Sequence, residues 1–125
     1  MNTATFNVTG GPIVAEVRSA FAQPGSYGIL LWEADSNEVV MEKRGNFLND
    51  ADDAHDLPTP NQQNHRRLVQ CLVTLAITPP ITDYRVDLII SQDGNVLGGD
   101  SDPGSNASGV VNSTLFVQLI AEGEA

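Results

Sequence analysis

The chain has a single cysteine, few basic residues and no long apolar run, and each shortage excludes a class of protein. With Cys71 alone no internal disulfide can form, which excludes the disulfide-stapled secreted miniproteins. No apolar run approaches the roughly 18 residues that cross a bilayer, so we expect a soluble protein without membrane contact. The first residues have neither the basic nor the apolar part of a secretory signal, so the cytoplasm is the expected compartment.

Positive charge is also scarce, because six Lys and Arg stand against 16 Asp and Glu, for a formal net charge of −10. Such a chain repels a phosphate backbone, so nucleic acid is not an expected partner. The sequence also lacks a G-x-S-x-G elbow, an H-E-x-x-H pair, a phosphate-binding glycine loop and a dinucleotide fingerprint. We therefore expect no enzyme and predict no catalytic residue; a hydrolase built from acidic residues ranks third among the possible functions.

What the chain does contain is a series of short segments in which apolar and polar residues alternate, separated by turns rich in Gly, Pro, Asn and Asp. Alternation with period 2 is typical of a strand that buries one face. The expected strands cover residues 5–9, 13–21, 27–34, 38–43, 65–78, 83–91 and 110–121, with a brief return at 96–97.

This pattern predicts a single all-β domain over residues 1–125, folded as a two-layer antiparallel β-sandwich of immunoglobulin-like type. A small closed β-barrel is the alternative, because the number of strands and their alternation do not separate the two. A long polar loop at about residues 46–64 interrupts the pattern, and we expect it to cross between the sheets or to cover one end of the domain.

Several expected strands carry large apolar residues on both faces. Either the long loop shields the outer faces, which we favour, or a protein partner or second copy covers them. Trp32, Leu72 and Phe116 are the candidate contact residues under the second interpretation. Cys71, in contrast, shares its face with neighbouring apolar residues, so we expect a buried structural thiol.

Candidate metal ligands gather in two acidic segments. Asp50, Asp52, Asp53 and Asp56 could supply oxygen ligands to calcium if their segment converges on a point. The EF-hand pattern is not met there, so a solvated acidic loop is the favoured interpretation and calcium the alternative cofactor. A second segment, from Asp93 to Asp102, could hold calcium at one end of the sandwich or could form ordinary turns.

These observations favour a non-enzymatic binding or assembly module that acts through protein–protein contacts, including self-association. The alternative is a calcium-assisted module that binds a ligand or a carbohydrate. The two differ in what they require: fixed oxygens from both acidic segments for the cation, or a contiguous apolar patch around Trp32, Leu72 and Phe116 for a protein partner.

Overall fold

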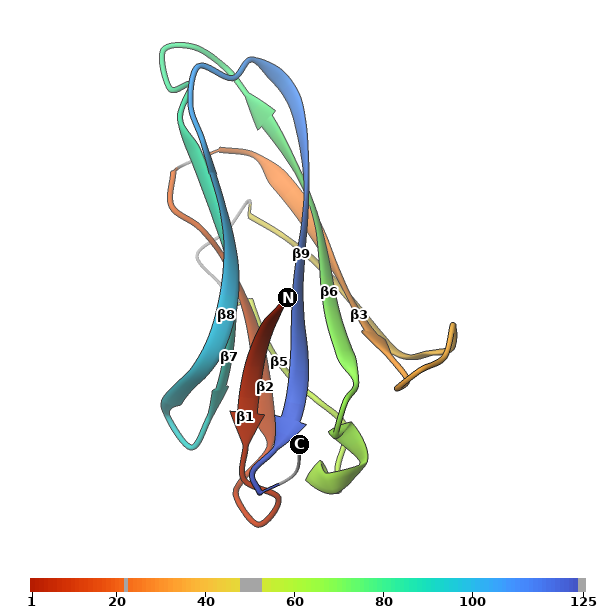
Figure 1. Cartoon of the computed structure of the whole chain (residues 1–125). Helices are drawn as coiled ribbons and strands as arrows, with labels where there is room; N and C mark the ends of the chain where they lie inside the picture. The colour runs from red at the N-terminus through yellow and green to blue at the C-terminus, as the bar shows by residue number, and fades with distance from the viewer. Residues whose placement is uncertain (22, 48–52, 124–125) are drawn as a thin grey trace.

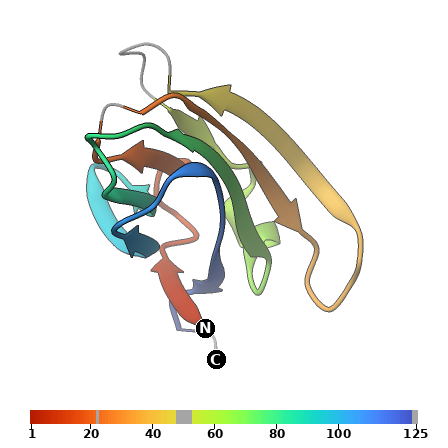
Figure 2. The same ribbon diagram turned by 90° about the horizontal axis from the view of Figure 1, so that it is seen from above.

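Nine strands form two sheets that pack face to face in the computed structural model, which describes residues 1–21, 23–47 and 53–123 (Figures 1 and 2). Sheet A has the strand order β1-β9-β6-β3-β4, and sheet B has the order β5-β2-β7-β8. Their bounds are β1 Asn2–Phe6, β2 Ile13–Ser19, β3 Gly25–Trp32, β4 Val39–Asn46, β5 Ala54–Asp56, β6 Leu68–Ile77, β7 Tyr84–Gln92, β8 Asn95–Gly104 and β9 Gly109–Ala121, with a short 3-10 turn, η1, at Asn61–Asn64.

The two sheets remain separate throughout the described residues and do not close into a barrel, which confirms the predicted all-β sandwich. Every strand pair is antiparallel except β1 and β9, which run parallel side by side (Figure 1). In the described part of the chain no helix is long or apolar enough to span a membrane.

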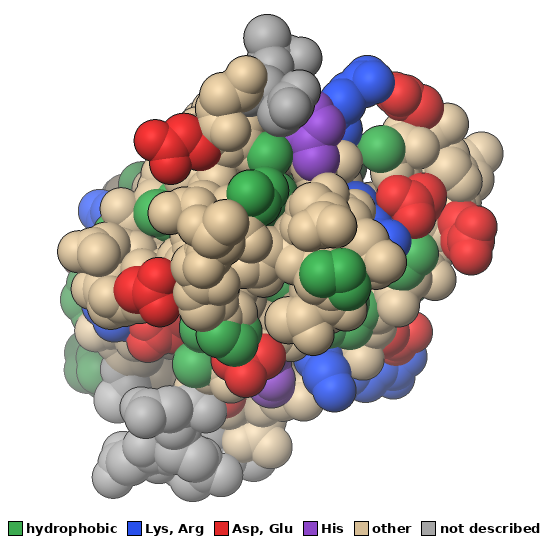
Figure 3. Space-filling view, turned by 90° about the horizontal axis from the view of Figure 1, so that it is seen from below, with side chains coloured by type: hydrophobic (Ala, Val, Ile, Leu, Met, Phe, Trp, Pro, Cys, Tyr) green, Lys and Arg blue, Asp and Glu red, His purple; other side chains and the backbone are tan. Residues whose placement is uncertain are grey.

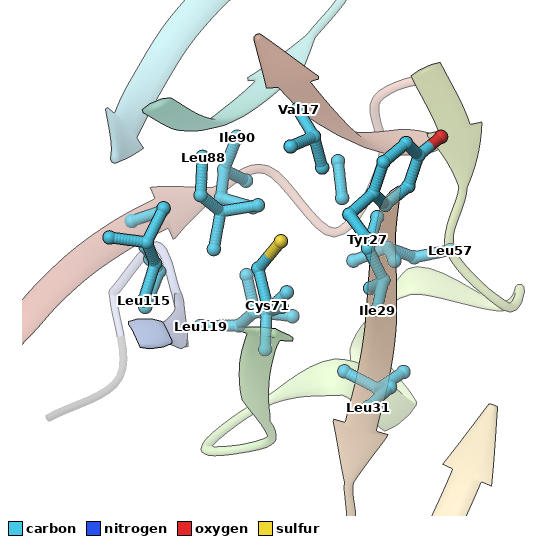
Figure 4. Close-up of a cluster of buried hydrophobic side chains, with 14 of the residues drawn as sticks. Val17, Tyr27, Ile29, Leu31, Leu57, Cys71, Leu88, Ile90, Leu115 and Leu119 are labelled. Atoms are coloured by element: carbon cyan, nitrogen blue, oxygen red, sulfur yellow. The ribbon is translucent and has the colours of Figure 1, made fainter. Parts of the chain in front are cut away.

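The core lies between the sheets and consists of every second residue of the long strands. Cys71 is fully buried in β6 and lies among Leu88, Ile90, Leu115 and Leu119 (Figure 4). Burial raises the pKa of its thiol to about 12, because the apolar surroundings disfavour the thiolate. The predicted buried structural thiol is therefore confirmed.

The segment after β4 contains more structure than the predicted loop at residues 46–64. Its described part forms β5, which pairs antiparallel with β2 at the edge of sheet B, and then η1, which lies against β9. Leu57, directly after β5, is buried in the core. The segment crosses between the sheets, as expected, but its described part extends sheet B and does not shield the outer face of sheet A.

β8 is much longer than the brief return strand predicted at residues 96–97. The predicted turn before it is present, since Asp93 and Gly94 both have positive φ, as a tight hairpin with two central residues requires. The sequence predicts that this strand ends after residue 97, because Gly98 and Gly99 are typical of turns. In the structure Gly98 lies so close to β1 that a Cβ there would stand 2.4 Å from the carbonyl oxygen of Thr3.

Candidate docking surface

The outer face of sheet A carries no charged side chain on four of its five strands. The register of the sheet determines which residues point away from sheet B. On β1, β3, β6 and β9, all of them described, none of these outward residues is Asp, Glu, Lys or Arg. They are Thr3, Thr5, Ser26, Gly28, Leu30, Trp32, Leu68, Gln70, Leu72, Thr74, Ala76, Val110, Asn112, Thr114, Phe116, Gln118 and Ile120, and we call them the uncharged face.

All three predicted contact residues lie on the uncharged face. Trp32 and Phe116 are half-buried, while Leu72 is 44% exposed at the middle of β6, the central strand of sheet A. Gln70 lies between the two aromatic residues, because it pairs with Phe116 on β9 and accepts a 2.8 Å hydrogen bond from Nε1 of Trp32. This bond fixes the indole ring against the sheet.

Two adjoining hollows mark the uncharged face. The first, of about 460 Å³, contains Trp32, Gln70 and Phe116, and the loop between β3 and β4 supplies one wall through Asn37. That loop projects beyond the rest of sheet A (Figure 2). The second hollow, of about 570 Å³, contains Leu72. Both volumes fall in the range of about 300 to 1,000 Å³ that ligand pockets occupy.

Charged side chains at the edge of the face help to line both hollows, Glu33, Asp35 and Arg66 the first and Glu42 and Arg44 the second, and each of them belongs to an ion pair. Arg66 forms an ion pair of 3.0 Å with Asp35, and Arg67, which is almost fully buried, forms one of 2.9 Å with Glu33. The hydrogen bond from Arg67 lowers the pKa of the Glu33 carboxyl. Seen from below, the acidic side chains form several separate groups, and Lys or Arg lies beside some of them (Figure 3).

A matching pair flanks the other hollow. On the edge strand β4, Arg44 contacts Glu42 at 2.7 Å. A neutral, partly apolar centre with charges confined to the rim is the arrangement found in protein–protein interfaces.

The predicted calcium ligands are only partly visible. Asp50 and Asp52 lie outside the described residues. Asp56 pairs with Val14 in the ladder between β5 and β2, and Asp53 accepts a hydrogen bond from Tyr27. Within residues 1–21, 23–47 and 53–123 no three His, Cys, Asp or Glu side chains converge in a way that could hold a metal ion.

The second acidic segment is a strand and not a loop. Asp93 lies at the hairpin turn and accepts hydrogen bonds from the backbone N–H of Gly11. Asp100 and Asp102 lie further along β8 and face β9, where Oδ2 of Asp100 accepts from the N–H of Phe116 at 3.0 Å. Of the two possibilities for this segment, the structure shows a turn at Asp93, and the three carboxylates, all of them described, do not converge on a metal site.

A cluster of three side chains closes the opposite side of the sandwich, and sequence reasoning missed it. The hydroxyl of Tyr27 on β3 donates to Oδ1 of Asp53 at 3.0 Å and lies 2.7 Å from Nε2 of His55 on β5. Burial raises the pKa of the Tyr27 hydroxyl, and the hydrogen bond to Asp53 adds to the shift. The one signal in the sequence was a polar aromatic residue at an inward position of a strand.

Comparisons with protein-family models, with curated proteins and with solved structures found no match.

Proposed function

We propose that the protein is a non-enzymatic binding module that acts through protein–protein contacts on the uncharged face. The observation that supports this function is the distribution of charge. In a chain with 22 charged residues, 16 acidic and six basic, four neighbouring strands present none on their outer side. A surface that contacts only solvent usually carries charged side chains. The centre of a protein interface, in contrast, is depleted of charge and enriched in aromatic residues.

Exposed apolar side chains on the same face add to this argument. Leu72 is 44% exposed at its centre and Val110 is 69% exposed toward one end. Between them lie polar residues without charge, such as Thr74 and Asn112, which hydrogen-bond to each other at 2.9 Å. These exposed apolar side chains are separated by polar groups without charge, so the face is neutral and only partly apolar.

Site-specific photo-crosslinking in cells that naturally produce the protein tests this function. Leu72 is replaced by p-benzoyl-phenylalanine, and the matched control carries the same group at Val96, which is 72% exposed on β8 of sheet B. We expect a discrete protein adduct from position 72 and little or none from the more exposed position 96. No protein adduct at position 72, or equal adducts at both positions, would contradict the proposed function.

Ligand binding in the hollow around Trp32 is the second candidate, supported by its volume of about 460 Å³ and by a half-buried indole ring held by Gln70. It ranks lower because Glu33 and Asp35, the acidic groups beside the hollow, are already paired with arginines. Trp32 is the only tryptophan, so its fluorescence reports on this hollow alone. Titration with neutral mono- and oligosaccharides should leave the emission unchanged if protein contacts are the function.

A further inference from the structure

We infer that His65 makes the attachment of the end of β9 dependent on pH, because its imidazole ring takes the place of a backbone acceptor. β6 and β9 pair antiparallel in a register that sets Leu68 opposite Gln118. Continued beyond Leu68, this register sets His65 opposite Ala121, where a regular ladder would join the N–H of Ala121 to a backbone carbonyl. Here that N–H donates to Nδ1 of the His65 ring at 3.0 Å. The inference does not depend on the proposed function.

The backbone explains why a side chain supplies this acceptor. Leu119 still donates to the carbonyl of Arg67 at 2.9 Å, as in a regular ladder. Arg66 then has a φ of 68°, in the left-handed region that few residues other than glycine adopt, and its N–H donates to the carbonyl of Leu119 at 2.7 Å. The regular ladder therefore ends at Arg66, and the ring of His65 makes the last bond to β9 on this side.

This bond exists only with a neutral imidazole. A backbone N–H can only donate, so Nδ1 must carry a lone pair and the ring proton must lie on Nε2. Protonation places a hydrogen on Nδ1, and two donors then face each other. An unperturbed imidazole titrates near about pH 6.5. The bond therefore stabilises the end of β9 above that pH, and its contribution is lost as the pH falls, because the opened segment binds a proton that the closed one cannot accept.

No carboxylate compensates for the lost bond. The elements packed against the ring, η1, β1 and β9, contain no charged residue, and Glu122, which follows β9, is exposed. On its own segment, Arg66 and Arg67 are engaged in the ion pairs described above. None of the ion pairs in the described part of the chain includes His65.

The loss should loosen one end of the uncharged face and leave the rest of the fold intact. Gln118 and Ile120 belong to that face and lie next to Ala121 in β9. On the other side of β9 the pairing with β1 contains no titratable group, since Phe6 lies opposite Ala121 and its carbonyl accepts from the N–H of Glu122 at 2.7 Å. Acid therefore frees the end of β9 on the β6 side only.

Hydrogen exchange of the full chain, followed by NMR, tests the inference. The exchange rate of the Ala121 amide, divided by its intrinsic rate at each pH, measures how often the end of β9 opens. We expect this opening to become at least about fivefold more frequent between about pH 7.5 and 5 in the wild-type protein.

Two variants separate the ring of His65 from other titrating groups. His65→Asn places an amide oxygen where Nδ1 stood, and this oxygen accepts a hydrogen bond at every pH. The opening at Ala121 should then change by less than about twofold over the same range. His55→Gln is the matched control, because it removes the other histidine, on β5, and should keep the wild-type response. Circular dichroism shows whether each variant is folded.

Three results overturn the inference. An opening at Ala121 that does not change with pH in the wild-type protein would show that protonation leaves the bond intact. An equal increase in His65→Asn would assign the response to another group. The third result needs no variant: the nitrogen chemical shifts of the wild-type ring at neutral pH would place the proton on Nδ1 instead of Nε2.

Discussion

The hydroxyl of Tyr27 donates a 3.0 Å hydrogen bond to Oδ1 of Asp53, and this bond connects sheet A to the segment that enters sheet B. Tyr27 belongs to β3 of sheet A, and Asp53 directly precedes β5 of sheet B. The backbone is tied at the same place, because the carbonyl oxygen of Asp53 accepts from the N–H of Val17 at 3.1 Å. Gly45 makes room for the tyrosine, since a Cβ there would overlap its ring.

Removal of that hydroxyl should destabilise the fold. Tyr27→Phe leaves Asp53 and His55 without their shared partner in a half-buried place, so we expect the free energy of unfolding to fall by about 1 to 3 kcal/mol. Urea denaturation measures the change. Tyr84→Phe is the matched control, because no hydrogen bond of the Tyr84 hydroxyl is found in the described part of the chain. It should cost less than about 0.5 kcal/mol, and an equal loss in both variants would show that the cluster does not hold the sheets together.

Burial of Cys71 predicts a loss of stability at alkaline pH. The thiol has a pKa of about 12 in the folded protein and about 8.5 in an unfolded chain. As the pH rises above the unfolded value, the unfolded state releases its proton while the native state keeps it, so stability is complete below about pH 8.5 and falls toward pH 12. Tyr27, whose pKa is also raised, acts in the same direction above about pH 10.

Comparison with Cys71→Ala isolates the contribution of the thiol. Between about pH 8 and 11 the wild-type protein should lose about 3 kcal/mol more unfolding free energy than the variant. Parallel pH profiles would show that the thiol is not shielded in the folded state. In the native protein at neutral pH a thiol reagent should react with Cys71 only at the rate at which the fold opens. Addition of urea should increase that reaction rate.

Much of the fold could be predicted from the sequence, because inward core residues alternate with outward residues along the strands. β6 is the clearest case, since its outward and inward residues follow period 2 over all ten residues. β8 could not be predicted in this way, because Gly98, Gly99 and Pro103 are typical of turns. Its acidic residues form long-range hydrogen bonds with β9, which no local sequence pattern predicts. Asp102 accepts from Oγ of Ser113 on the neighbouring sheet.

The candidate surface was predictable only in part. Large apolar residues on both faces of the strands pointed to Trp32, Leu72 and Phe116, and the register places all three on one face. The absence of charge on that face could not be recognised beforehand, because it depends on which strands are neighbours. β6 pairs with β9, which lies about 40 positions further along the sequence. Local propensity does not predict which distant strands become neighbours in a sheet.

Close approach of β8 to β1 predicts that Gly98 tolerates no side chain. A Cβ at Gly98 would lie 2.4 Å from the backbone carbonyl oxygen of Thr3, which cannot move without displacing β1. Gly98→Ala should therefore cost about 1 to 3 kcal/mol through overpacking. Gly28→Ala is the control, because a Cβ there comes no closer than 3.9 Å to its neighbours, and it should change stability by less than about 0.5 kcal/mol. Equal effects in urea denaturation would refute the close approach.

Calcium should have little effect on the melting temperature. A native-state site would raise stability by RT ln(1 + [L]/Kd), roughly 2.7 kcal/mol at a hundredfold excess of ion over Kd. Solvated carboxylates gain only ionic screening, which magnesium or sodium chloride at the same ionic strength supplies equally. Asp53 already accepts a hydrogen bond from Tyr27, and Asp56 lies in a strand. We therefore expect millimolar calcium to raise the melting temperature by less than about 2 °C, where a saturated site would give several degrees.

Variants at the acidic segment make this last prediction decisive. Asp50→Asn together with Asp52→Asn removes two of the four predicted ligands without touching the hydrogen bond between Asp53 and Tyr27. If the carboxylates are solvated, the pair of substitutions leaves the small response to calcium unchanged, and magnesium reproduces it. A calcium-specific rise of several degrees that these substitutions abolish would establish a cation site between β4 and β5. The calcium-assisted ligand module would then replace protein contact as the leading function.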